Sequence, residues 1–154
     1  MRVIQQASFR DISDIIALTG RAIRTCIDEP SDIQDGLIAS CADSVMWWRA
    51  HPDLALHYVY RIDGSVVGAL LVKEYWNLSN LFVDPAYHHQ GIARQLINKA
   101  LEECKTRSPK QAVHLNASRY AVNFYQKLGF VPNGEPRDLP GGCFPFIYKF
   151  NQSP

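Results

Sequence analysis

The stretch LFVDPAYHHQGIAR, residues 81–94, carries the clearest local signal in this chain. A strand pattern comes first, Asp84-Pro85 forms a turn, and a small-residue bend leads into a helix pattern. Gly91 and Ala93 let the main chain approach a ligand closely. The first amides of a helix lack partners within the helix and lie at its positive end, so the stretch predicts a diphosphate site. An ordinary strand-to-helix turn explains the stretch equally well, and neither GxxxxGK[ST] nor GxGxxG is present.

The flanking sequence predicts strands and helices on both sides of this bend. Upstream we expect helices over 8–26 and 31–39 and strands at 3–4, 56–62, 66–72 and 76–83, with a hairpin turn at Asp63-Gly64. Downstream we expect a helix over 91–105, a strand over 111–115, a helix capped by Ser118, an extended 130–131 segment, a loop and a strand over 143–150. Consecutive strands followed by alternation with helices favour a mixed sheet with helices on both faces.

Composition and charge narrow the class of protein. The 154 residues are 47% hydrophobic and 20% charged, which is typical of a globular chain. The length predicts a single domain over residues 1–154. A net charge of +1 leaves no excess positive field for coating phosphates, so we expect no nucleic-acid partner.

Membrane, disulfide and metal signals are weak in this sequence. No apolar run approaches the roughly 20 residues that span a bilayer, and the N-terminus turns polar too early for a signal peptide. We therefore expect a cytoplasmic protein with no membrane partner. The cysteines are scattered and predict free thiols, and the histidine spacing predicts no metal site.

Residues 81–101 resemble the acetyl-CoA-binding motif of the GNAT family of N-acetyltransferases. That motif is Arg or Gln, two residues, Gly, one residue, then Gly or Ala; here it falls on residues 88–93, with His88 at the first position. A second block, residues 116–130, is similar to the family's second block, in the right order and spacing. The resemblance implies the acyl-CoA N-acyltransferase fold. This is an α/β (α+β-like) fold whose mixed, mostly antiparallel sheet of about seven strands carries about four helices on its two faces.

The resemblance also implies roles for individual residues. Main-chain groups of Leu81 and Val83 would bind the pantetheine arm like an added strand. Amides of residues 89–94 would hold the pyrophosphate, Asn116 the pantetheine, and Phe124 would pack along the cofactor. The full set expected to bind acetyl-CoA, the co-substrate, is Leu81, Phe82, Val83, His88, His89, Gln90, Gly91, Ile92, Ala93, Arg94, Asn116 and Phe124.

Acetyl transfer to an amine requires a neutral amine, a polarised carbonyl and a proton for the departing thiolate. An ordinary amine has a pKa of about 10.4, so a base or a desolvating pocket must supply its neutral form. By the resemblance, Tyr125 is the general acid, and the Val83 amide polarises the carbonyl. A tyrosine in the apolar stripe of its helix also suits a purely structural place in the core.

The general base is less well defined. The positions that match the family's base carry Asn77 and Ser79, and neither is a useful base. Glu74 is the nearest carboxylate and is our candidate, acting through water. His114 and a water chain without a dedicated base are the alternatives.

The acceptor side offers three features. The acidic cluster Asp28, Glu29, Asp32 and Asp35 either attracts a cationic amine or compensates a helix dipole. The aromatic residues Trp47, Trp48, Tyr75 and Trp76 either form a wall for the acceptor or lie in the core. The Pro/Gly-rich loop over 133–146 is placed to cover the acceptor.

The sequence thus predicts an acetyl-CoA-dependent N-acetyltransferase. Its expected partners are acetyl-CoA and an unidentified primary amine on a small molecule or peptide, which attacks directly in a ternary complex. The alternatives are a non-catalytic acyl-CoA-binding or sensor module, which the missing carboxylate at Asn77 and Ser79 would suit, and a protein-directed acetyltransferase. Homodimers are common in the family, so a homodimer is a further expectation from the resemblance.

Overall fold

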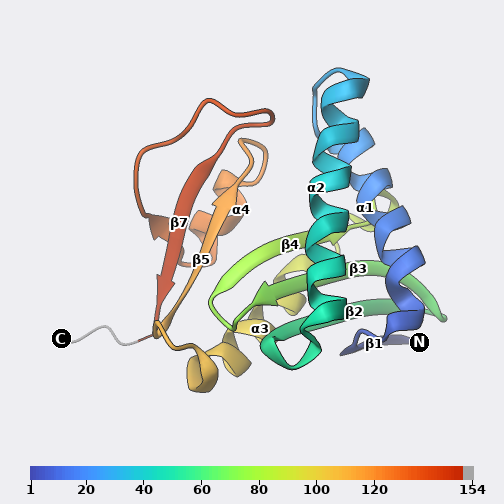
Figure 1. The fold of residues 1–154 in the computed structure, drawn as a ribbon, viewed down its shortest axis with the longest axis horizontal. Helices are drawn as coiled ribbons and strands as arrows, with labels where there is room; N and C mark the ends of the chain where they lie inside the picture. The colour runs from blue at the N-terminus through green and yellow to red at the C-terminus, as the bar shows by residue number, and fades with distance from the viewer. Residues whose placement is uncertain (151–154) are drawn as a thin grey trace.

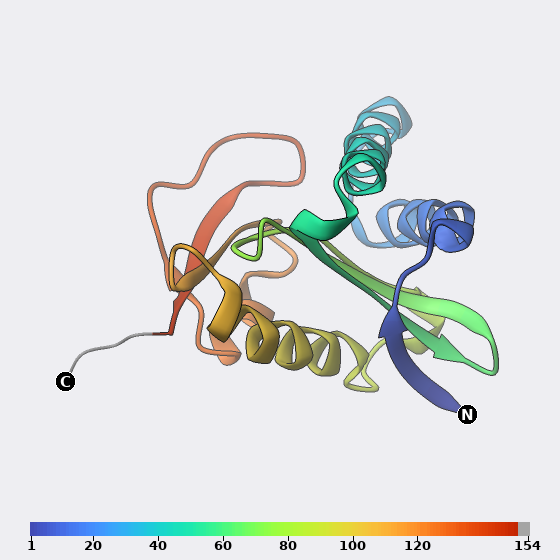
Figure 2. The ribbon, with the colours of Figure 1, turned by 60° about the horizontal axis from the view of Figure 1, so that its bottom comes forward.

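One seven-stranded sheet organises the computed structural model, which describes residues 1–150. Its strand order is β1-β2-β3-β4-β5-β7-β6. Helices α1 and α2 cover one face and α3 and α4 the other (Figure 1, Figure 2). The strands are β1 (Arg2–Gln6), β2 (Ala55–Ile62), β3 (Ser65–Lys73), β4 (Asn77–Val83), β5 (Ala112–Ala117), β6 (Val131–Pro132) and β7 (Phe144–Lys149). The helices are α1 (Ile12–Cys26), α2 (Ser31–Ala50), α3 (Ile92–Arg107) and α4 (Val122–Lys127).

This architecture confirms the predicted fold. Every neighbouring pair of strands is antiparallel except β4 and β5, which are parallel. The order of strands and helices along the chain is also the predicted one. The four cysteines are free, as predicted. Within residues 1–150, no helix is both long and apolar enough to cross a bilayer.

Two hydrophobic cores form because the central strands are buried on both faces. Along β2, Tyr58 and Tyr60 pack toward α3, whereas Val59 packs toward α1 and α2. Gly68 on β3 lets α3 lie close to the sheet, since a Cβ atom there would come within 3.1 Å of Ile92 and Leu96. The cores therefore hold α3 tightly against the strands that precede it.

Two helices differ from the sequence expectation. The helix predicted over 31–39 continues to Ala50, because Val45 and Trp48 become buried against the sheet. The last helix begins at Val122 with Ala121 as its N-cap, so Ser118 is not its cap. At the N-terminus, Ser8 and Asp11 form a capping box, and the Ser8 N–H donates to Asp11 Oδ2 at 2.9 Å.

The feature that positions the site is the separation of β4 from β5. Their ladder has only two rungs, Asn77 with His114 and Leu78 with Leu115. The register of β4 against β3 shifts just beyond these rungs, between Leu71 and Val72 of β3. Residues 79–83 of β4 therefore have a strand neighbour only on the β3 side.

Candidate active site

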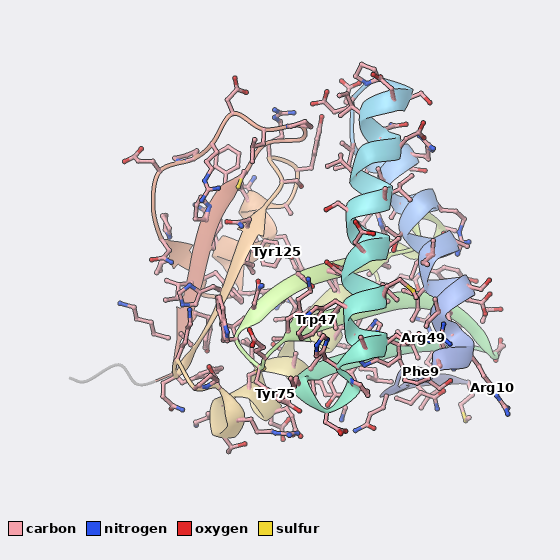
Figure 3. All side chains as sticks on the ribbon, viewed as in Figure 1. Phe9, Arg10, Trp47, Arg49, Tyr75 and Tyr125 are labelled. Atoms are coloured by element: carbon pink, nitrogen blue, oxygen red, sulfur yellow. The ribbon has the colours of Figure 1, made fainter. Side chains whose placement is uncertain are left out.

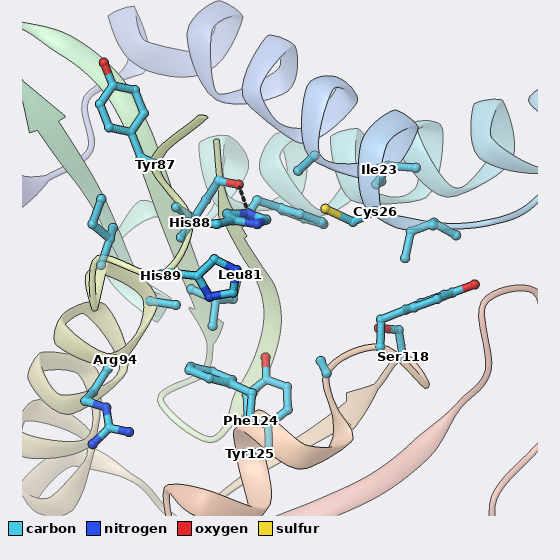
Figure 4. Close-up of a pocket in the computed structure, with 18 of the residues that line it drawn as sticks. Ile23, Cys26, Leu81, Tyr87, His88, His89, Arg94, Ser118, Phe124 and Tyr125 are labelled. Carbon is cyan, nitrogen blue, oxygen red and sulfur yellow. Dashed lines mark hydrogen bonds between the residues drawn. The ribbon is translucent and has the colours of Figure 1, made fainter. Parts of the chain in front are cut away.

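A cavity of about 790 Å³ opens where β4 leaves β5. The end of α1, the end of β4, the start of α3 and the start of α4 form its walls (Figure 4). It brings together most of the residues expected to bind acetyl-CoA, and Tyr125 as well. These are Leu81, Phe82, Val83, His88, His89, Gly91, Ile92, Ala93, Arg94 and Phe124.

The main chain of β4 faces this cavity. The His88 imidazole Nε2 donates to the Val83 carbonyl at 3.0 Å, so that carbonyl points away from β3 (Figure 4). In an antiparallel pair the main-chain groups of alternate residues face the same side, which places those of Leu81 with those of Val83. The open edge of β4 thus offers hydrogen-bonding groups to an extended, amide-bearing ligand.

The start of α3 lines the next part of the cavity. Gly91, the N-cap residue, has a φ of +78°, and His89 before it has a φ of +64°. Because Gly91 is left-handed, a side chain there would strain the bend. The first turn of α3 holds no acidic residue, so nothing in that turn offsets the positive end of the helix dipole. Free amides and a positive dipole at the cavity wall suit an anionic ligand.

Tyr125 and Phe124 form the wall opposite β4. The Tyr125 hydroxyl points into the cavity, across from Leu81 and His89 (Figure 4). Only 7% of Tyr125 is exposed, and this burial raises the pKa of its phenol. A raised pKa keeps the hydroxyl protonated at neutral pH, so it can donate a hydrogen bond to a group in the cavity.

Three of the expected site residues lie outside the cavity lining. Gln90 is exposed, and its side chain accepts a hydrogen bond from Arg2 at 2.7 Å. Asn116 lines a second pocket instead, because alternation along β5 turns it to the other face of the sheet. Glu74 lies in the β3–β4 turn with a φ of +55° and lines neither pocket.

The cavity also contains residues to which the sequence analysis gave no binding role. Ser118, two positions after Asn116, lines it together with Tyr120, and Cys26 lines it from α1. Ser118 lies just past the end of β5, where the strand's alternation no longer holds, so it reaches the cavity although Asn116, two positions earlier, faces the second pocket. Nothing in the sequence pointed to a binding role for Cys26, because a lone thiol on a helix is usually structural.

The acceptor-side features separate in the structure. Glu29 accepts a hydrogen bond from the Gly141 N–H at 3.1 Å, and Asp35 pairs with Arg24, so these carboxylates are engaged outside the cavity. The aromatic residues do not form one wall. Trp48 lies in the core beside α1, Trp47 stacks on His51, Tyr75 lies 4.0 Å from the Arg107 guanidinium, and Trp76 lines the second pocket.

Known proteins share parts of this sequence and the whole of this fold. Residues 41–144 match the family model described as the acetyltransferase (GNAT) domain. The chain belongs to the GNAT family. The shared fold extends further: the GNAT chain superposes on a PaiA N-acetyltransferase from Thermoplasma acidophilum in complex with coenzyme A with a TM-score of 0.80. That match has 20% identity and covers 97% of this chain and 99% of that one. A GNAT family acetyltransferase from Brucella melitensis in complex with acetyl-CoA gives a TM-score of 0.71 at 20% identity, over 99% and 90% of the two chains.

Curated relatives of this GNAT chain are more similar in sequence but match over shorter stretches. Protein ElaA of Escherichia coli is 34% identical over 101 residues, which is 63% of this chain and 59% of ElaA. The uncharacterized N-acetyltransferase MJ1207 of Methanocaldococcus jannaschii is 30% identical over 96 residues, which is 54% of this chain and 42% of that protein. Within residues 1–150, no group of three or more His, Cys, Asp or Glu side chains is arranged to hold a metal ion.

Proposed function

We propose that this protein is an acetyl-CoA-dependent N-acetyltransferase. It transfers the acetyl group to a primary amine of a small molecule or peptide by direct attack in a ternary complex. One observation supports this proposal above all: the open edge of β4, the left-handed Gly91 and the start of α3 all line the same cavity. We further propose that residues 1–154 act as one domain, since both cores pack on a single sheet.

The cavity fits acetyl-CoA in two parts. The main-chain groups of Leu81 and Val83 would pair with the amides of the pantetheine arm, as an added strand would. The amides of Ile92, Ala93 and Arg94 at the start of α3 would hold the pyrophosphate. Phe124 offers an apolar surface between these two sets of polar groups.

The chemistry follows from which groups face the thioester. The neutral amine forms a C–N bond to the acetyl carbon while the Val83 N–H donates to the carbonyl oxygen. The C–S bond then breaks, and the departing thiolate takes a proton from the Tyr125 hydroxyl, which water later restores. The amide nitrogen releases its extra proton to solvent.

The cavity supplies a neutral amine by desolvation. The wall contributed by α1 and its C-cap residue is apolar, with Ala22, Ile23 and Ile27, and among residues 1–150 no carboxylate lines the cavity. Moving an ammonium group into such surroundings disfavours its charged form and lowers its pKa. A dedicated base is therefore not required for the attacking nitrogen.

A second function is favoured by one feature: Asn77 and Ser79 stand where a base would be expected, so the chain could bind acyl-CoA without transferring it. Two measurements separate the functions. Calorimetry with acetyl-CoA tests binding, and a thiol-release assay over a panel of primary amines tests transfer. Binding with amine-dependent thiol release supports the transferase; binding without release supports the non-catalytic module. No binding at all would falsify both.

A further inference from the structure

A second pocket, of about 540 Å³, lies on the α1/α2 face of the sheet. It has no lining residue in common with the cavity described above. Its polar lining comes from β4, from β5 and from the start of the β6–β7 loop: Asn77, His114, Asn116, Asn133, Glu135 and Arg137.

Two charged side chains of this pocket are unpaired within residues 1–150. In the described part of the chain, neither the Arg137 guanidinium nor the Glu135 carboxylate forms an ion pair or a side-chain hydrogen bond. The neighbouring cation is already engaged, because Lys110 Nζ lies 3.4 Å from the centre of the Trp76 ring. Partial burial and Lys110 lower the pKa of His114, so its imidazole adds no charge at neutral pH. One free positive and one free negative group therefore remain.

The amides of this pocket add hydrogen-bonding groups without charge. Asn77 and His114 form a rung of the β4–β5 ladder, and Asn133 lies 3.4 Å from the His114 ring nitrogen. A guanidinium beside uncharged amides is well suited to a carboxylate, because its planar fork binds both oxygens. Glu135, two residues before Arg137, would accept an ammonium group on the same ligand.

The pocket and the cavity come close together at the end of β5. Asn116 in the pocket and Ser118 in the cavity are two residues apart, which is at most about 7 Å along the chain. The β6–β7 loop begins at the pocket and, at Gly141, reaches the α1–α2 segment next to the cavity. A ligand whose ionic head lies beside Arg137 could thus extend an amine past the end of β5 toward the thioester.

We propose that this pocket selects the acceptor by its carboxylate: the substrate is an amine whose chain also carries a carboxylate several bonds away. This rests on the proposed acetyltransferase function. Arg137 binds the carboxylate, and Glu135 binds an ammonium group beside it when the head is zwitterionic, as in an ω-amino acid with an α-amino group. Arg137 is thereby a specificity-determining residue that makes no contact with the reacting atoms.

Pairs of amines that differ by one carboxylate test this. We would compare 6-aminohexanoate with hexylamine, and lysine with cadaverine, by released thiol at saturating acetyl-CoA. In the native protein the carboxylate-bearing member of each pair should have a kcat/KM higher by about tenfold or more. Arg137→Gln should bring this ratio close to one, and Arg137→Lys should retain part of it, with the KM for acetyl-CoA unchanged in both.

Arg10→Gln is the matched control, because Arg10 projects from the far edge of the molecule and lines neither pocket (Figure 3). It should keep the native ratio. If hexylamine and cadaverine reacted as fast as, or faster than, their carboxylate-bearing partners in the native protein, this inference would be overturned while the proposed function would stand. The same would follow from a ratio that survives Arg137→Gln. Binding of acetyl-CoA with no thiol release from any amine would overturn the proposed function, and this inference with it.

Discussion

Tyr125 combines a buried ring with a hydroxyl that faces the cavity, so its two roles can be separated by one atom. Tyr125→Phe keeps the ring contact with Phe130, whose centroid lies 5.5 Å away, and removes only the hydroxyl that we propose as the proton donor. We expect kcat to fall by about 100-fold with the KM for acetyl-CoA unchanged. Since burial raises the pKa of Tyr125, the native rate should show no loss from this group as the pH rises to about 9. Steady-state kinetics of both proteins check this, and an unchanged kcat would remove Tyr125 from the chemistry.

His57 gives the fold a dependence on pH. It is 5% exposed beside Trp48, and burial lowers its pKa to about 4. The unfolded chain binds this proton near pH 6.5 and the folded chain only near 4. Stability is therefore complete above pH 6.5 and is lost as the pH falls toward 4. Between pH 7.5 and 5 the free energy of unfolding should drop by about 2 kcal/mol from this residue.

Urea unfolding at these two pH values measures the effect of His57. His57→Gln should remove most of this drop, even if the variant is less stable at both pH values. His51→Gln should retain it, since His51 is exposed. If the free energy of unfolding fell equally between pH 7.5 and 5 in the native protein and in His57→Gln, other groups would be the cause of the pH dependence.

At the scale of single elements, the contact between β3 and α3 connects the core to the start of α3. A Cβ atom on Gly68 would lie 3.1 Å from both Ile92 Cγ2 and Leu96 Cδ1. Gly68→Ala should therefore push α3 away from the sheet, destabilise the protein by about 1–3 kcal/mol and weaken acetyl-CoA binding. Gly36→Ala is the control: Gly36 lies in α2 with nothing within 4 Å of a Cβ, so it should stabilise by about 0.5–1 kcal/mol. Chemical denaturation and calorimetry on both variants measure these changes, and normal acetyl-CoA affinity in Gly68→Ala would contradict the expectation.

The same elements show what the sequence could predict. The bend at Gly91 and the helix after it were predictable because a left-handed glycine and an apolar helical stripe are both local signals. The second half of α2 was not, because in that half only Val45 and Trp48 are buried and their burial depends on the sheet beneath them. The sequence could not predict which of Asn116 and Ser118 lines the cavity either. Which of them reaches the cavity depends on where β5 leaves β4, a long-range property of the sheet.

Across the whole molecule, Glu29 links three segments that are distant in sequence. It lies between α1 and α2, accepts a hydrogen bond from the Gly141 N–H in the β6–β7 loop, and lies 3.6 Å from Arg119 in the β5–α4 loop. The Arg119 N–H donates in turn to the Gly141 carbonyl at 3.0 Å. These contacts hold together segments that line the cavity through Ile27 on one side and Ser118 and Tyr120 on the other.

Loss of the Glu29 side chain should therefore loosen the acceptor side of the cavity and leave the start of α3 intact. We expect Glu29→Ala to raise the KM for the amine by about threefold to tenfold while the KM for acetyl-CoA stays the same. Glu29→Gln should have a smaller effect, since its amide oxygen still accepts from Gly141 and only the charge facing Arg119 is lost. Asp35→Asn, which removes a carboxylate paired with Arg24 outside the cavity, should leave both KM values at their native level. If Glu29→Ala raised the two KM values equally, the three segments would be supporting the cofactor side as well, because the cavity would then be loosening as one unit.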